Sequence, residues 1–309
     1  YDPLCGLCFT YCPRTFLDMA AMESKLFGRT RKEDEALGIY KKAVSAQAQP
    51  VLEAAQDGGV ATALLIQALQ SGMIDCAIVT SRDEEWRTQT LIATSPEEIR
   101  SAAGTKYTIH NSVMAVKDAL EMGYKKIGFV GTPCQIQGLR KVKLLDEPYQ
   151  FGQDKIALLV GLFCMENFDY DALMNGLVKG KFGLEPKDVA RFEIKKGMFR
   201  VIDKAGGAHE VKIEETDPYT FPGCGPCFDF ASELADVSVG SVGSADGWST
   251  VLTRTDMGEK LYGDALAAGL IAEKAVSEKG LALAKRLAAG KVERFLRKSE
   301  EMKVGGIIR

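Results

Sequence analysis

The distribution of apolar and polar positions along the chain predicts an α/β protein. Short runs of consecutive apolar residues are typical of strands buried on both faces, and stretches with apolar residues at helical spacing predict helices between them. Strands are predicted at residues 40–48, 74–80, 85–93, 127–130, 155–163 and 249–254. Helices are predicted to begin near residues 59, 95 and 135 and to cover residues 111–122, 169–182, 256–268 and 277–302. Because strands alternate with helices, we expect a mixed, partly parallel sheet with flanking helices.

Three stretches depart from this alternation. Residues 189–213 alternate in polarity and turn twice at glycines, which predicts an antiparallel strand insertion. Residues 14–38 are mixed and charged, with a short helical pattern, and are expected to be a linker onto the main domain. The long amphipathic helix near the C-terminus is either a solvated flank or a contact with another subunit. The expected division is a partial ferredoxin-like arm and linker at 1–38, an α/β domain at 39–275 and a C-terminal helix at 276–309.

Two turns in the first half of the chain are candidate ligand-binding segments. Asp57, Gly58 and Gly59 precede a predicted helix that carries Thr62 in its first turn, and Asp57 is the candidate N-cap residue. A helix start of this kind receives anions well, but the short motif by itself is more often a simple turn. The second turn, Gly104-Thr105-Lys106-Tyr107, offers amides, a hydroxyl, a cation and an aromatic ring together.

Composition narrows the class of protein. The 309 residues are 46% hydrophobic, which is enough to bury a full core. The net charge of −3, with interspersed signs, argues against nucleic acid as the main partner. No apolar run approaches about 18 residues and no basic-then-apolar leader opens the sequence. We therefore expect a cytoplasmic protein, either free or peripheral to a membrane complex, without a transmembrane segment of its own. The chain opens on Tyr1 rather than Met, so we also expect that something upstream was removed or is not included.

The numbers of cysteines and histidines narrow the kinds of metal site and catalytic site that the chain can form. Eight cysteines stand against two histidines, so zinc-hydrolase or triad chemistry has few candidate bases. Nothing suggests secretion, and the chain is too large to need disulfides for stability. Ligation by cysteine alone points to zinc or to iron–sulfur. Cys76 lies inside a predicted strand and is interpreted as a small buried hydrophobic residue.

The first cysteine motif is Cys5-x2-Cys8-x3-Cys12-Pro13, which matches the last three positions of the bacterial ferredoxin run. The proline favours a [4Fe–4S] cluster over zinc. Asp2 stands where the full run has a fourth cysteine, so this carboxylate or a cysteine upstream would complete the cluster. In two-cluster ferredoxins the cysteine before the proline ligates the other cluster, so Cys12 need not share a cluster with Cys5 and Cys8.

A second set of cysteines is scattered along the chain. Cys134 and Cys164 each follow a predicted strand, and both are expected at one edge of the sheet because ligands gather at the carboxyl ends of parallel strands. Cys224 and Cys227 form a C-x-x-C pair that can bind one metal centre. These four thiols match the ligand count of a [4Fe–4S] cluster, but their spacing alone leaves the assignment open.

A strand after the C-x-x-C pair runs into a loop rich in glycine and serine. Backbone N–H groups and small hydroxyls in such a loop suit a phosphate group or a flat cofactor ring. The candidate residues of this loop are Ser241, Val242, Gly243, Ser244, Asp246, Gly247, Trp248 and Ser249. The residues therefore favour a metal centre beside a bound organic cofactor.

Four separated motifs resemble the coenzyme F420-reducing hydrogenase / F420H2 dehydrogenase β-subunit family. They are Gly131-Thr-Pro-Cys134-Gln, Cys164-Met-Glu-Asn167, Cys224-x-x-Cys227 and residues 238–250. The resemblance runs from about residue 40 to about residue 300, in order and without large gaps. The N-terminal cysteine run is similar to part of the ferredoxin extension carried by F420H2 dehydrogenase-type and other fused members.

The resemblance implies an iron–sulfur flavoprotein of archaeal methanogenesis, an oxidoreductase that holds FAD and [4Fe–4S] clusters and takes coenzyme F420 as substrate. It implies that Cys134, Cys164, Cys224 and Cys227 hold one cluster, and that the turns at 57–59 and 104–107 and the loop at 241–249 surround FAD. Hydride would pass between F420 and FAD, and single electrons would pass through clusters to or from a hydrogenase, formate dehydrogenase, heterodisulfide reductase or similar redox subunit. No catalytic side chain is expected, because the cofactors carry the chemistry.

Several alternatives stay open at this point. Lys106, Lys195 or Lys196 would be available to the acidic tail of F420, but as plain surface lysines they have a simpler interpretation. Two alternatives to an F420 oxidoreductase are an electron-relay subunit without its own F420 site and a family member that uses NAD(P)H or ferredoxin. The last alternative is a zinc-stabilised binding module. The partner complex and the direction of electron flow do not follow from the sequence.

Overall fold

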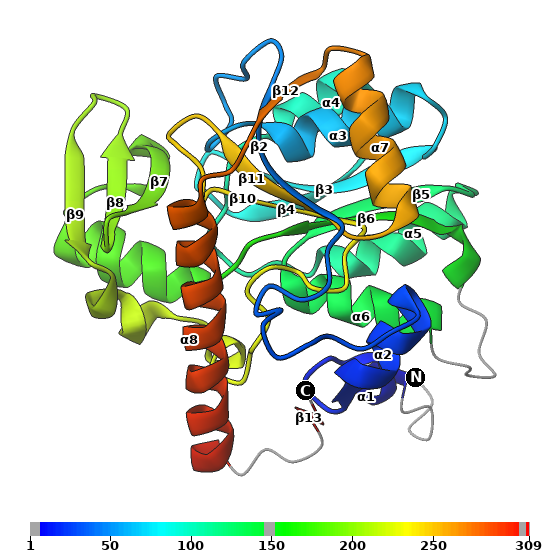
Figure 1. The fold of residues 1–309 in the computed structure, drawn as a ribbon. Helices are drawn as coiled ribbons and strands as arrows, with labels where there is room; N and C mark the ends of the chain where they lie inside the picture. The colour runs from blue at the N-terminus through cyan, green and yellow to red at the C-terminus, as the bar shows by residue number, and fades with distance from the viewer. Residues whose placement is uncertain (1–6, 145–151, 303–306, 309) are drawn as a thin grey trace.

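The structure of the protein is a computed structural model that describes residues 7–144, 152–302 and 307–308. The described residues build an eight-stranded sheet in the order β12-β2-β11-β10-β6-β5-β3-β4 (Figure 1). Its strands are β2 Lys42–Ala48, β3 Cys76–Arg82, β4 Thr88–Ala93, β5 Ile127–Gly131, β6 Ile156–Leu162, β10 Val237–Gly240, β11 Ser249–Thr253 and β12 Ile271–Lys274. Strands β3, β5, β6 and β10 are parallel to one another, and the outer strands are antiparallel to their neighbours. The prediction of a mixed, partly parallel sheet is confirmed.

Helices cover both faces of this sheet (Figure 1). One face packs against α3 Val60–Gln70, α4 Pro96–Ser101 and α7 Asp256–Ala267, and the other against α2 Met19–Phe27, α5 Ala115–Glu121 and α6 Pro133–Leu144. The apolar run of β6 explains this arrangement, because Leu158 belongs to the first core and its neighbour Leu159 to the second. The sequence pattern of unbroken apolar strands therefore reflects a sheet that is buried on both sides.

The antiparallel insertion forms a smaller unit at one side of the sheet (Figure 1). Its strands are β7 Val189–Lys195, β8 Met198–Asp203 and β9 Ala208–Lys212. Lys196 and Gly197 form the two-residue turn between β7 and β8, with φ of 51° and 76°, which suits the tight hairpin turn that the sequence predicts. The inner face of this sheet packs on the π-helix η3 Ala172–Lys181 through Phe192, Phe199 and Leu177, among others.

Some sequence predictions are corrected by the structure. Asp57 is not the N-cap of α3: Gly59 occupies that position with φ of 67°, and no side chain caps the helix. Helix α6 begins at Pro133, so Cys134 lies inside its first turn rather than before it. Strand β12 is not recognised in the sequence pattern, because it is a short edge strand of only half-apolar composition. The helix predicted to begin near residue 95 is α4, and Ser95 and Glu98 form a capping box at its start.

The two ends of the described chain pack against the main domain. The N-terminal elements are α1 Leu7–Tyr11 and β1 Leu17–Asp18, and β13 Ile307–Ile308 pairs with β1. The long helix α8 Glu278–Met302 buries one side, including Ala288, Lys291 and Phe295 (Figure 1). It is therefore more than the solvated flank or intersubunit surface that its charged pattern indicates. Within the described ranges, no helix is long and apolar enough to cross a membrane. The remaining short turns are η1 Ser112–Met114, η2 Gln153–Lys155, η4 Pro186–Asp188, η5 Ile213–Tyr219 and η6 Pro222–Cys224.

Candidate cofactor site

The order of the central strands brings two cysteines to one edge of the sheet. Cys134 lies in the first turn of α6, just after β5, and Cys164 lies two residues after β6. Strands β5 and β6 are parallel neighbours, so the two residues leave the sheet at the same edge. The short turn η6 ends at Cys224, and Cys227 follows three residues later in the chain.

The four thiols lie in one neighbourhood. Burial raises the pKa of Cys164, and the nearby thiols of Cys227, Cys134 and Cys224 raise it further against the opposing effect of a lysine. Asn167 contacts two of the sulfurs: its backbone N–H donates to the Cys224 sulfur at 3.3 Å, and its side-chain amide donates to the Cys164 sulfur at 3.8 Å. Asn167 thus connects the loop after β6 to the C-x-x-C turn.

The four cysteines supply as many thiol ligands as a [4Fe–4S] cluster needs. All four cysteines are free thiols. Among the described residues, no three His, Cys, Asp or Glu side chains are close enough together to hold one ion. A [4Fe–4S] cluster binds each cysteine through a different iron atom, so its ligands stand farther apart than those of a tetrahedral zinc ion. Four neighbouring free thiols are therefore compatible with a cluster.

A cavity of about 440 Å³ adjoins the cysteines. Cys134 and Cys224 line it, and the N-terminal segment contributes Cys12. Most of the remaining wall is apolar and comes from Pro13, Ile109, Val113, Val142 and Phe221, among others. Such a wall limits the access of water, which is one of the factors that set the potential of an iron–sulfur centre. Cys5 lies outside the described residues, and the side chain of Cys8 is not described either.

The three segments expected around a flavin lie close to one another. The backbone N–H of Gly58 donates to the Ser249 hydroxyl at 3.1 Å, which joins the turn at 57–59 to the end of the loop at 241–249. A Cβ atom at Gly58 would stand 2.6 Å from the Ala46 carbonyl oxygen, and one at Gly104 would stand 2.7 Å from that of Ala54. Only glycine permits these close approaches, so the turn at 57–59 is held against β2 and the turn at 104–107 against the loop that follows β2.

Tyr107 connects these segments to the cysteines. Burial raises the pKa of Tyr107, and the charges of Asp57, Glu193 and Cys164 raise it further. Burial also raises the pKa of Asp57 to about 6, while Lys195 opposes that shift. The Phe168 N–H also donates to the Tyr107 carbonyl at 2.8 Å, so the turn at 104–107 lies against the loop that follows Cys164.

Other candidate residues of the glycine-rich loop have partners within the protein. The Ser244 hydroxyl lies 2.8 Å from that of Thr250, and the carbonyl of Gly247 accepts a hydrogen bond from Gln47 at 2.8 Å. The ammonium of Lys274 lies 3.8 Å from the ring centroid of Trp248. These contacts fix the loop before any ligand binds. Val242 packs beside α8, Ser241 is exposed, and Thr62 and Thr105 are half-buried on α3 and on the second turn.

The candidate lysines differ in their surroundings. The ammonium of Lys106 donates to the carbonyls of Ala102, Ala103 and Gly104, and burial lowers its pKa to about 8. Lys195 forms an ion pair with Asp246 at 3.3 Å. Lys196 lies at the exposed tip of the β7–β8 turn. Lys106 therefore shapes its own turn, whereas the other two remain accessible on the hairpin.

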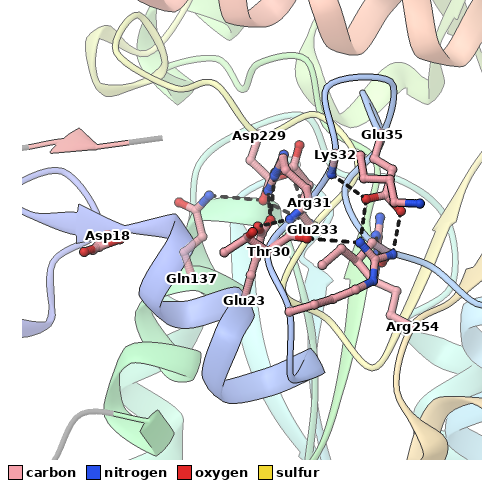
Figure 2. Close-up of polar contacts among 12 residues, drawn as sticks. Asp18, Glu23, Thr30, Arg31, Lys32, Glu35, Gln137, Asp229, Glu233 and Arg254 are labelled. Atoms are coloured by element: carbon pink, nitrogen blue, oxygen red, sulfur yellow. Dashed lines mark hydrogen bonds and ion pairs between the residues drawn. The ribbon is translucent and has the colours of Figure 1, made fainter.

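A buried polar and ionic network includes Asp229, two residues after Cys227 (Figure 2). Gln137 on α6 donates to Asp229 at 3.1 Å, and the Asp229 carboxylate accepts the backbone N–H of Glu233. Glu233 pairs with Arg31 at 2.6 Å. The fully buried Arg254 donates to Ser238 and to the carbonyls of Ile39 and Ala231. The network fixes the segment that follows Cys227 to several distant parts of the chain.

Two cations near the thiols are not among the residues that the sequence motifs indicate. Arg14 follows the ferredoxin-like run directly, which is a weak signal that a basic residue accompanies the cysteines. Lys291 is 1% exposed and lies on the buried side of α8. Its ammonium donates to the backbone carbonyls of Cys164 and Asp229. Its only sequence signal is a lysine at helical spacing between Ala288 and Phe295.

Comparison with known proteins decides the family. Residues 43–117 match the family described as coenzyme F420 hydrogenase/dehydrogenase, beta subunit N-term, and residues 124–279 match the family described for the C terminus of the same beta subunit. The chain belongs to the coenzyme F420 hydrogenase/dehydrogenase beta-subunit family. The resemblance seen in the sequence motifs is thereby confirmed.

Several members of the beta-subunit family cover most of the chain. This chain is 42% identical over 264 residues to coenzyme F420 hydrogenase subunit beta of Methanothermobacter thermautotrophicus, and the match covers 84% of this chain and 93% of that protein. The corresponding protein of Methanosarcina barkeri is 40% identical, covering 89% and 96%. In the solved F420-reducing [NiFe] hydrogenase complex of Methanosarcina barkeri, derivatised with xenon, one chain matches with a TM-score of 0.83 and 39% identity, covering 88% of this chain and 95% of that one.

Proposed function

We propose that the protein is the F420-oxidising or F420-reducing subunit of a redox complex, which exchanges electrons between coenzyme F420 and a partner subunit through bound FAD and [4Fe–4S] clusters. The family assignment supports the link to F420. The observation that carries the finer proposal is a backbone hydrogen bond from the Phe168 N–H to the Tyr107 carbonyl at 2.8 Å, which holds the candidate flavin turn at 104–107 against the loop that follows Cys164. This contact supports a short distance between the two cofactors.

Different segments of the chain would bind FAD, the cluster and F420. FAD, when bound, exchanges a hydride with F420 and single electrons with the cluster, and so connects a two-electron reagent to a one-electron carrier. The turns at 57–59 and 104–107 and the loop at 241–249 would hold it. Cys134, Cys164, Cys224 and Cys227 would hold the cluster, and the apolar wall of the adjoining cavity would exclude water. Lys195 and Lys196, on the exposed hairpin, would meet the acidic tail of F420.

The N-terminal arm would extend the electron path. Cys12 lines the cavity beside Cys134 and Cys224, so the arm approaches the central site. We propose that Cys5, Cys8 and Cys12 hold a further cluster or part of one. A hydrogenase-type partner is favoured by the complex in which the structural relative occurs. A formate dehydrogenase or heterodisulfide reductase partner fits the same chemistry, and a cytoplasmic location fits such a role.

Quantification of iron, acid-labile sulfide and flavin on the anaerobically purified protein tests the proposal. We expect at least four iron and four sulfide per chain, together with one FAD that F420H2 reduces. Clusters without flavin would select the electron-relay alternative, and zinc without sulfide would select the binding module. A flavin that is reduced by NADH or by ferredoxin, but not by F420H2, would show a change of substrate.

The contact between α8 and the glycine-rich loop gives a second test, specific to the flavin site. A Cβ atom added at Gly280 would overlap the Gly243 carbonyl oxygen and lie 2.8 Å from its carbonyl carbon. Because these are backbone atoms, the loop has to move, at a cost of about 1–3 kcal/mol. Gly280→Ala is therefore expected to weaken FAD binding about tenfold or more, measured by titration of the flavin-free protein.

Gly290→Ala on the same helix is the matched control. Nothing lies within 4 Å of a Cβ atom at that position, so FAD affinity should not change. The free energy of unfolding is expected to rise by up to about 1 kcal/mol, because alanine favours the helix over glycine. Equal FAD affinities of the two variants would argue against a flavin at the 241–249 loop.

A further inference from the structure

Arg14 is the one residue of the described N-terminal segment that reaches a candidate cluster ligand with a charged side chain. Its guanidinium donates to the Cys227 sulfur at 3.4 Å and to the Pro226 carbonyl at 2.8 Å. Its backbone N–H donates to the Cys12 sulfur at 3.4 Å. The residue therefore lies between the cysteine of the arm and a cysteine of the central set.

The guanidinium is held in place by several contacts. Besides Cys227 and Pro226, it donates to the Gln137 side chain at 3.4 Å, and Gln137 in turn donates to Asp229. Arg14 also lines the cavity beside Cys134. An arginine with this many partners presents its charge in a fixed direction, because the planar fork loses little freedom on binding. The hydrogen bond to sulfur is thus a defined feature of the site.

A cation in this position changes the energy of the cluster in one direction. A [4Fe–4S] centre with four thiolate ligands is an anion, and reduction adds one more negative charge. A nearby positive charge and a hydrogen bond to a ligand sulfur both stabilise the more negative state. Lys291 supplies a second cation near the cysteines, but its ammonium donates to backbone carbonyls rather than to sulfur. Of these two cations, only Arg14 donates a hydrogen bond to the sulfur of a candidate cluster ligand.

We propose that Arg14 is a positioning residue for the central cluster, which raises its reduction potential through the charge and hydrogen bond that the N-terminal arm delivers to Cys227. This inference rests on the proposed function, since it requires a cluster at the four cysteines. It gives the arm a role beyond carrying cysteines of its own. The driving force for electron transfer from the flavin then depends on whether the arm is docked.

The test is a redox titration followed by electron paramagnetic resonance on the anaerobically purified full chain. The signal of the central cluster is the one that Cys224→Ser removes. Arg14→Gln is expected to lower its midpoint potential by about 59 mV or more, equal to a tenfold smaller ratio of reduced to oxidised cluster at a fixed potential. Arg29→Gln is the matched control, because Arg29 is an exposed arginine of the same segment whose partner is Glu35. The midpoint potential of the central cluster in Arg29→Gln should equal that of the wild type.

An unchanged potential in Arg14→Gln, with iron content retained, would overturn the inference and leave the proposed function intact. Wild-type protein without iron and sulfide would overturn both. If Arg14→Gln loses its iron, Arg14→Lys provides the decision, because it keeps the charge and loses the arginine's defined hydrogen bond to Cys227. A potential below that of the wild type supports the contribution of the hydrogen bond to Cys227, and an equal potential overturns that part of the inference.

Discussion

Cys224→Ser is expected to separate the two half-reactions of the protein. The variant should still accept hydride from F420H2 on its flavin, because the turns at 57–59 and 104–107 do not include Cys224. Electron exit to a one-electron dye should fall by at least about a hundredfold, since loss of a ligand exceeds the 10–100-fold effects of removing a residue that only supports a ligand. Stopped-flow reduction of the flavin and steady-state reduction of the dye measure the two steps.

The control for this experiment is Cys76→Ala. Cys76 is fully buried in β3, as its place in the sequence predicts, and burial raises the pKa of its thiol to about 11, so it is neither reactive nor a ligand. The variant should lose a little stability and retain both half-reactions and full iron content. If Cys224→Ser slows flavin reduction and dye reduction equally, the proposed division between the flavin and the cluster is wrong.

The positions of Cys134 and Cys164 were predictable because they depend on a local pattern and a general rule. Each follows a short apolar strand, and parallel neighbours end at the same edge of a sheet. The β7–β8 hairpin was predictable for a similar reason, since Lys196-Gly197 between alternating segments specifies a tight turn. In each case, the information lies within a few residues of the feature that it determines.

Arg14 and Lys291 were not predictable as site residues, because their roles arise from contacts across the whole chain. Arg14 meets Cys227 across 213 positions of sequence, and Lys291 meets Cys164 across 127. The wrong N-cap at Asp57 has a related cause. The neighbouring Gly58 N–H donates to the Ser249 hydroxyl across 191 positions of sequence, and no side chain caps α3. Tertiary contacts thus replaced the local interaction that the motif favours.

Lys291→Met is expected to lower the free energy of unfolding by about 2–6 kcal/mol, because two buried backbone carbonyls would each lose a hydrogen-bond donor at about 1–3 kcal/mol. Lys291 is 1% exposed, and its ammonium donates to the carbonyls of Cys164 and Asp229. Burial acts to lower its pKa, but the charges of Cys227, Cys164 and Asp229 raise it, so the group stays protonated. Methionine fills a similar volume without donating a hydrogen bond or carrying a charge. Both carbonyls and the nearby acidic groups would then be left without compensation.

Urea denaturation of the metal-free protein measures this loss, and Lys279→Met on the exposed first turn of α8 is the control, expected within about 0.5 kcal/mol of the wild type. The same substitution should weaken retention of iron, because Lys291 fixes the backbone at one cluster ligand and offsets the charge of the thiolates. A fall in stability with normal iron retention would make Lys291 a packing residue only. Iron loss at unchanged stability would mean that its charge serves the cluster alone. We expect both effects together, since one ammonium group joins α8 to the loop that carries Cys164.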